Sequence, residues 1–100
     1  DANRSYYPVA AGVRAVLPAH YGCINSQSVG ESQRAILDYY AGIRIYPLEA
    51  GDRLSCDLYL IQDERGHGLV MPGQDWKLVW KGKRASDRRE SFRLYQRIAG

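Results

Sequence analysis

The stretch GDRLSCDLYLIQDERGHGLV, residues 51–70, is the clearest indication of the fold, because it contains a strand, a polar turn and the start of a second strand. Every second residue from Leu54 to Leu60 is apolar. Since successive side chains of a strand point to opposite faces, this set is predicted to face the core and Asp57 to face water. The turn DERG ends at Gly66, a residue type that adopts the positive φ of tight hairpin turns.

The same period of two recurs along the chain and predicts an all-β fold. The other predicted strands are GVRAVLP up to Pro18, IRIYP up to Pro47, GLVM before Pro72, WKLVWK and FRLYQRI. In WKLVWK, we expect Trp76, Leu78 and Trp80 to face the core. Short strands spaced by about ten residues and separated by Gly, Pro and Asp turns favour an antiparallel β-sandwich or small barrel. Residues 1–100 are predicted to form it as a single domain.

Residues 31–41, ESQRAILDYYA, fit two interpretations. They contain strong helix formers, with Ser28 or Ser32 as a candidate cap and Gly42 as a candidate stop, which favours one short helix. The alternation of apolar and aromatic residues also suits a strand. Because the neighbouring segments are predicted strands, the strand is preferred, and a short helix is the alternative.

The bulk properties are those of an ordinary globular domain. The chain has 100 residues, of which 45% are hydrophobic and 25% charged. No apolar run approaches the roughly 20 residues of a membrane-spanning helix. The chain begins at Asp1 rather than Met, as expected of a mature or trimmed chain whose leader has been removed.

The positive charge is concentrated in residues 76–100. That stretch holds eight of the fourteen Lys and Arg side chains against only Asp87 and Glu90. Such a bias occurs in proteins that bind nucleic acid, anionic lipid or an acidic partner. No aromatic-interleaved nucleic-acid motif accompanies it, so we interpret it as the solvated face of a basic hairpin and expect no nucleic-acid partner.

The two cysteines, Cys23 and Cys56, are too far apart in sequence for a CxxC motif. In an oxidising compartment they are candidates for one disulfide that closes a long loop. The alternative is two buried free thiols, since free cysteine is among the most buried residue types.

No catalytic, metal or cofactor site is predicted. His20 lies three residues before Cys23, but no nucleophile signature surrounds this pair. The spacing of the two cysteines with His20 and His67 does not fit compact zinc sites. The GHG sequence at residues 66–68 lacks the pattern of a phosphate-binding loop. The chain is therefore interpreted as a non-enzymatic binding or structural module without a cofactor.

The order of these segments resembles the YscW-type lipoprotein family, which includes the secretin pilotins of type III secretion systems. The similarity covers residues 13–98 and rests on Leu17-Pro18 after an early strand, on IRIYP, on RLSC at residues 53–56 and on the strand from Leu58 to Ile61. The resemblance implies a compact β-sandwich in the periplasm or at the periplasmic face of the outer membrane, held there by an upstream lipid anchor. It also implies a chaperone-like role: binding the C-terminal tail of a secretin subunit and aiding its targeting or ring assembly. We also expect the chain to be a monomer.

Two other classes of function remain open. One is a periplasmic inhibitor of a lysozyme-type enzyme, because YGC and WKG are similar to segments of small barrel inhibitors. The other is a small basic β-barrel that binds nucleic acid through the C-terminal hairpin.

Tyrosine is the abundant aromatic residue, with eight in the chain. Its apolar ring and polar hydroxyl suit a surface that contacts a partner. The tyrosines on the less clearly core-facing positions are the candidate partner contacts; they are Tyr39, Tyr40, Tyr46 and Tyr59.

Overall fold

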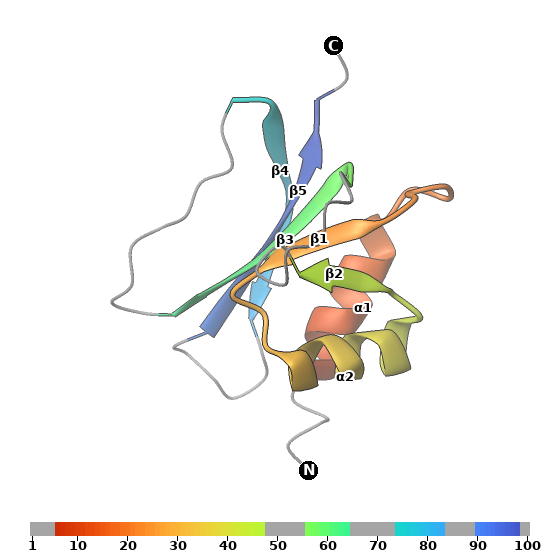
Figure 1. Ribbon diagram of the computed structural model, residues 1–100, viewed down its shortest axis with the longest axis vertical. Coiled ribbons are helices and arrows are strands. Elements are labelled where there is room, and N and C mark those ends of the chain that lie inside the picture. The colour runs from red at the N-terminus through yellow and green to blue at the C-terminus, as the bar shows by residue number, and fades with distance from the viewer. Residues whose placement is uncertain (1–5, 48–55, 65–73, 84–89, 99–100) are drawn as a thin grey trace.

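The computed structural model describes residues 6–47, 56–64, 74–83 and 90–98 (Figure 1). In chain order, the elements of these residues are α1 (Tyr7–Val16), β1 (Ile24–Gln27), α2 (Glu31–Ala41), β2 (Ile45–Pro47), β3 (Leu58–Glu64), β4 (Trp76–Lys83) and β5 (Glu90–Arg97). Among the features of the sequence prediction that lie outside the described residues are Leu54, the turn at Gly66, the GHG sequence and the strand GLVM.

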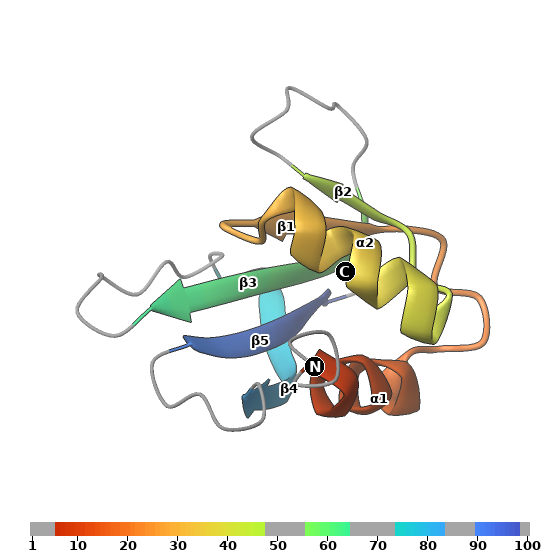
Figure 2. The ribbon, with the colours of Figure 1, turned by 90° about the horizontal axis from the view of Figure 1, so that it is seen from below.

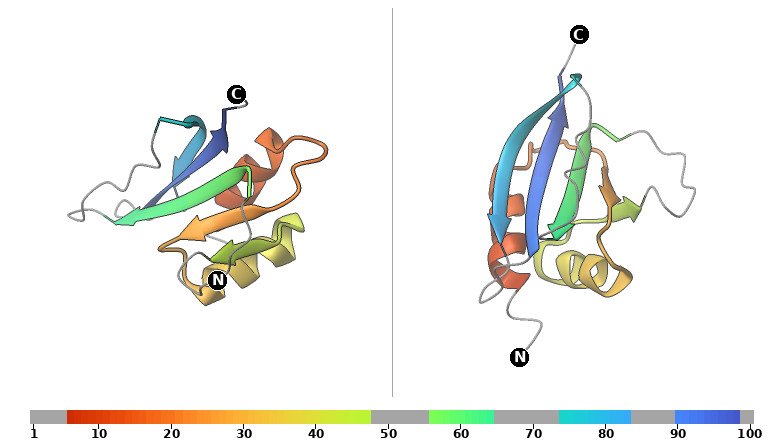
Figure 3. Two further views of the ribbon diagram at one scale, coloured as in Figure 1. Left: turned by 45° about the horizontal axis from the view of Figure 1, so that its top comes forward. Right: turned by 90° about the vertical axis from the view of Figure 1, so that its left-hand side faces the viewer.

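The strands form one mixed sheet in the order β2-β1-β3-β5-β4. β1 is parallel to both β2 and β3, whereas β5 is antiparallel to both β3 and β4. α2 connects β1 to β2, because a tight turn cannot join parallel neighbours. α1 and α2 lie against the same face of the sheet (Figure 2). Within the described residues β2 and β4 are its two edges, so the sheet is not closed into a barrel (Figure 3).

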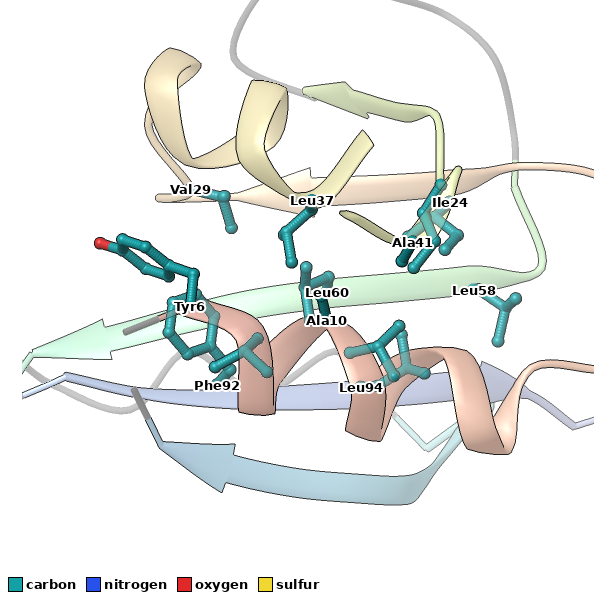
Figure 4. Close-up of a cluster of buried hydrophobic side chains, with 13 residues drawn as sticks. Tyr6, Ala10, Ile24, Val29, Leu37, Ala41, Leu58, Leu60, Phe92 and Leu94 are labelled. Carbon is teal, nitrogen blue, oxygen red and sulfur yellow. The ribbon is translucent and has the colours of Figure 1, made fainter. Parts of the chain in front are cut away.

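The main core lies between the two helices and this face of the sheet. Figure 4 shows side chains from both helices meeting those of β1, β3 and β5. The fully buried members include Val9 and Val13 of α1, Leu37 of α2, and Ile24, Leu58, Leu60, Phe92 and Leu94 of the sheet. Removal of this apolar surface from water is the main force that holds the two layers together.

The prediction of a strand-rich domain is confirmed, but the all-β antiparallel sandwich or small barrel is wrong. Two helices form a second layer, and the sheet contains parallel pairs. One cause is the segment 13–17, predicted as a strand, most of which belongs to α1. Pro8 lies in the first helical turn, where its missing N–H costs nothing, and Val9 and Val13 lie one turn apart on the buried face. Ala15 is exposed, so the period-two pattern does not mark a strand face here.

The short helix at residues 31–41 is confirmed as α2, and the preferred strand is wrong. The segment connects two parallel strands, a connection that requires a crossover rather than another strand of a meander. Gly42 ends the helix as predicted, with a φ of 65° in the left-handed region that glycine adopts at low cost. Gly30 is the N-cap in place of the predicted Ser28 or Ser32.

β3 lies in the middle of the sheet and is buried on both faces. Leu58 and Leu60 are 2% and 0% exposed and face the helices, which confirms the predicted core face. Asp57 is exposed, as predicted. Tyr59 and Ile61 on the opposite face are also buried, at 8% and 0% exposed. Both faces of this strand are therefore covered, and alternation along it does not distinguish a buried face from a solvent-exposed one.

A β-bulge at Val79 divides β4 into two parts. Leu78 and Trp80 pair with consecutive residues of β5, which leaves Val79 as the extra residue and reverses the alternation. The prediction that Trp76, Leu78 and Trp80 share one core face is therefore wrong. Trp80 packs against the core beneath the helices, Trp76 packs against the opposite face, and Leu78 is 50% exposed.

The Trp80 ring also joins α1 to the edge strand β4. A Cβ atom at Gly12 of α1 would lie 2.5 Å from the indole nitrogen Nε1 of Trp80, and one at Gly82 of β4 would lie closer still to the ring. Both glycines therefore make room for the indole between helix and strand.

Cys23 and Cys56 form a disulfide, with Cα atoms 5.2 Å apart. Cys23 immediately precedes β1, and Cys56 lies two residues before β3, so the bond lies just before the starts of these two parallel strands. Asn25 reinforces this junction, because its Oδ1 accepts a hydrogen bond from the backbone N–H of Cys56 at 3.0 Å.

Candidate functional site

A groove of about 520 Å³ lies between α1 and α2. Its lining residues are Tyr7, Ala10, Ala11, Arg14 and Ala15 of α1 with Tyr40, Ala41 and Gly42 at the end of α2. The α1 residues follow the i, i+3, i+4, i+7, i+8 spacing of a single helix face. One stripe of α1 and the last turn of α2 therefore build the groove.

The groove has a floor of small residues and a rim of tyrosines. Ala10 and Ala41 are 2% and 7% exposed, so methyl groups form the bottom. Tyr7 is 57% exposed, and its ring centre lies 5.4 Å from that of Tyr40 in an edge-to-face contact. Tyr40 makes a second such contact at 5.2 Å with Tyr39, which is 84% exposed. Three tyrosine rings thus form a row of edge-to-face contacts beside the groove.

Arg14 is the only charged side chain among the described residues that line the groove. Its Nη1 donates a hydrogen bond to the carbonyl oxygen of Ala41. This oxygen is one of the last of α2, which have no partner inside the helix. The bond holds the guanidinium across the two helices, at the end of the groove where both helices stop.

The four tyrosines predicted as partner contacts lie on two separate surfaces. Tyr39 and Tyr40 are neighbours beside the groove. Tyr46 of β2 and Tyr59 of β3 both pair with Asn25, on either side of β1 and on the face away from the helices. Tyr46 is half-buried, and Tyr59 is only 8% exposed. The structure therefore does not bring the four together, and Tyr59 offers little surface to a partner.

The face of the sheet away from the helices carries a second group of aromatic and cationic side chains. This sheet-face cluster comprises Tyr59, Ile61, Trp76, Arg93, Tyr95 and Arg97. Arg93 is 7% exposed, and its Nη1 donates a hydrogen bond to the hydroxyl of Tyr95. The guanidinium carbon of Arg97 lies 4.5 Å from the ring centre of Trp76, which is a cation–π distance. These side chains contact one another within the protein, so the cluster belongs to the packing of the fold.

Arg97 connects the sheet-face cluster to the disulfide. Its Nε lies 3.4 Å from Oδ1 of Asp57, and its Nη2 donates a hydrogen bond of 3.3 Å to the carbonyl of Cys56. The described basic side chains of the predicted hairpin therefore divide into two groups. The lysines of β4 are exposed, whereas Arg93 and Arg97 of β5 make contacts within the protein.

The remaining candidates from the sequence that the structure describes are not brought together into a reactive site. Cys23 is bonded to Cys56 and is not a free thiol beside His20, which is exposed. In the described ranges, no group of three or more His, Cys, Asp or Glu residues is placed to hold a metal ion. His67 lies outside those ranges.

Tyr7 and Arg14 of the groove are absent from the sequence prediction, because no helix is predicted over residues 7–16 and the segment around Arg14 is interpreted as a strand. The helical signal that identifies them is the i, i+3, i+4, i+7, i+8 spacing of residues 7, 10, 11, 14 and 15, together with Pro8 at the start of the segment.

Comparisons of the chain with models of protein families, with curated proteins and with solved structures find no match. The resemblance to the YscW-type lipoproteins therefore stays a prediction from the sequence pattern. None of the described helices has the length and apolar character needed to cross a membrane.

Proposed function

We propose that this protein is a non-enzymatic binding protein that takes an apolar peptide segment in the groove between α1 and α2. The observation that carries the proposal is the exposure of aromatic rings beside an alanine floor, with Tyr7 57% and Tyr39 84% exposed. A partner that covers such rings removes apolar surface from water on both sides. Tyrosine also loses little conformational freedom on binding, which makes it an effective anchor.

The shape of the groove suits a peptide. Ala10 and Ala11 carry only methyl groups, so a peptide backbone can approach α1 closely. The volume of about 520 Å³ falls within the range of about 300–1,000 Å³ that is usual for ligand sites. Grooves beside helices bind apolar segments in many peptide-recognition proteins.

The partner that we propose first is the C-terminal tail of a secretin subunit, as the sequence resemblance implies. The protein would then act as a pilotin-like chaperone at the periplasmic face of the outer membrane. The support for this choice is the sequence pattern alone. The mixed sheet and the two helices differ from the β-sandwich that the resemblance implied.

Calorimetric titration tests the proposal with a synthetic peptide that has the C-terminal sequence of a type III secretion secretin subunit. Tyr7→Ala should weaken binding about tenfold, since it removes an exposed anchor of the kind that often contributes more than 1 kcal/mol. The control is Tyr46→Ala on the opposite face of the sheet, which should leave the affinity unchanged. Absence of binding at millimolar peptide would end the secretin proposal, and equal losses in the two variants would contradict the groove.

A second candidate function is binding of nucleic acid by the exposed lysines of the edge strand β4, which are Lys77, Lys81 and Lys83. Lysines on an edge strand also prevent pairing with other strands, an explanation that needs no ligand. Titration with single-stranded DNA at low and high salt distinguishes nucleic-acid binding from edge protection. Affinity that falls steeply with salt supports nucleic-acid binding, and no binding at low salt supports edge protection.

A further inference from the structure

β4 is the edge of the sheet beside β5, and among the described residues no further strand pairs with it (Figure 3). An edge strand presents a row of backbone N–H and C=O groups that an extended chain can pair with. The bulge at Val79 interrupts β4, so the regular part of this edge that carries most of its charge runs from Trp80 to Lys83. We call residues 80–83 the basic edge.

The side chains of the basic edge alternate between the two faces of the sheet. Lys81 is opposite Arg93 of the sheet-face cluster, so Lys81 and Lys83 point to the face away from the helices. Trp80 points to the helix side, where its ring is only partly buried, and Gly82 on the same side has no side chain. A strand paired with this edge would therefore meet two cations on one face and an indole on the other.

The two lysines of the basic edge have no anionic partner in the described part of the chain. Lys81 and Lys83 are exposed, and neither makes an ion pair or a side-chain hydrogen bond there. The residue directly opposite Lys81 is Arg93, also a cation, so this cross-strand pair supplies no opposite charge. The lysines are two residues apart in one strand, about 7 Å along it. Carboxylates at every second residue of an added strand repeat at the same distance.

An acidic peptide fits this edge better than a nucleic acid does. Sites for single-stranded nucleic acid combine cations with rings on which bases stack. The rings nearest the lysines are already packed: Trp76 contacts Tyr59 and Arg97, and Trp80 packs against the main core. The basic edge offers backbone pairing instead, which a peptide can use.

We propose that the basic edge binds an extended peptide segment of alternating acidic and apolar residues as an added strand beside β4. The carboxylates lie against Lys81 and Lys83, and the apolar side chains lie against Trp80. The basic edge shares no residue with the lining of the groove between α1 and α2, so this inference does not rest on the proposed function.

The test measures binding of fluorescent ten-residue peptides to the full chain by anisotropy at low salt. The first peptide alternates glutamate and valine, the second has glutamine in place of glutamate, and the third is the first with a methyl group on every backbone nitrogen. We expect the second to bind about tenfold more weakly, because it loses the contacts between charged groups. The third should also bind at least about tenfold more weakly, because it has no N–H to donate to the edge.

Two variants locate the binding. Lys81→Gln should weaken binding of the acidic peptide about fivefold, because it removes one of the two charges that face the carboxylates. Lys77→Gln is the matched control: it removes an exposed lysine of the same strand that lies before the bulge and on the other face, so the affinity should stay unchanged.

Each contrary result overturns the inference. Equal binding of the glutamate and glutamine peptides would exclude recognition of charge, and equal binding of the methylated peptide would exclude an added strand. If no peptide binds, the lysines serve edge protection alone. If a single-stranded DNA of ten nucleotides binds more tightly than the acidic peptide, the edge is a nucleic-acid surface. A loss in Lys81→Gln that Lys77→Gln does not share, together with the two peptide differences, supports the inference.

Discussion

The groove and the sheet-face cluster are built from the same side-chain types, tyrosine and arginine, but these side chains are satisfied in different ways. In the sheet-face cluster, Arg93 and Tyr95 are 7% and 4% exposed and are hydrogen-bonded to each other. In the groove, Tyr7 is 57% exposed, and the guanidinium of Arg14 bonds a single backbone carbonyl. The first arrangement stabilises the fold, and the second leaves exposed rings for a partner. Residue type alone therefore does not identify a binding surface; exposure does.

The largest expected effect concerns stability. Tyr95→Ala should lower the free energy of unfolding by about 3–5 kcal/mol, because it removes a buried ring from the sheet-face cluster. Tyr7→Ala should change it by less than about 1 kcal/mol, because the ring is exposed. Urea denaturation of both variants measures the difference. Similar losses of unfolding free energy in the two variants would contradict the claim that the sheet-face cluster is part of the core and the groove is not.

The disulfide should stabilise the fold by a similar or slightly smaller amount. It adjoins the sheet-face cluster through the Cys56 carbonyl, which accepts a hydrogen bond from Arg97. Because it closes a loop with a sequence separation of 33, we expect reduction to cost about 3–4 kcal/mol.

Chemical denaturation with and without reductant measures the cost of reduction, and a Cys23→Ala/Cys56→Ala variant serves as the control for side effects of the reductant. Mass spectrometry of the unreduced protein should show two protons fewer than the dithiol form. Two free thiols in protein from an oxidising compartment would contradict the bond.

Gly12→Ala should destabilise the protein by about 1–2 kcal/mol. The added methyl group meets the Trp80 ring, and overpacking of this kind costs about 1–3 kcal/mol, partly offset by the higher helix propensity of alanine. Because α1 carries Tyr7 and Arg14, its displacement should also weaken peptide binding. The double variant Gly12→Ala/Trp80→Val should lose less stability than the sum of the single changes; strict additivity would show that the methyl group and the ring do not meet.

The smallest expected effect is at the ion pair between Asp57 and Arg97. The two side chains are 76% and 38% exposed, so Asp57→Asn should cost less than about 1 kcal/mol. The cation–π contact of Arg97 with Trp76 remains in this variant. A loss above about 2 kcal/mol in urea denaturation would mean that the sheet-face cluster depends on this pair far more than an exposed pair allows.

Much of the sheet could be predicted from the sequence, because period-two alternation reports the faces of a strand. It located β3, β4 and β5, and it placed Leu58 and Leu60 in the core. The two helices were harder to predict from the sequence. Apolar and polar residues alternate by chance in the segment after Val13. Only the packing of α1 against the sheet shows that a helix face is the buried side. The bulge at Val79 is a property of strand pairing, so no alternation rule could place Trp76 and Trp80 on opposite faces.

The candidate site was predicted in part. Tyr39 and Tyr40 do lie beside the groove, but Tyr46 and Tyr59 lie on the other face of the sheet. The groove exists only because α1 and α2, which are separated by β1 in the chain, pack side by side. Arg14 becomes part of it through a bond to a backbone carbonyl of the other helix, and such a contact leaves no pattern in the sequence.

The most direct test of the account is to map peptide contacts on isotope-labelled protein by NMR. Titration with the secretin tail peptide should shift the amide resonances of the groove, at Ala10, Ala11, Ala41 and Gly42, while those of the sheet-face cluster stay in place. Shifts confined to β3 and β5, with the groove unchanged, would contradict the claim that the helices provide the binding surface.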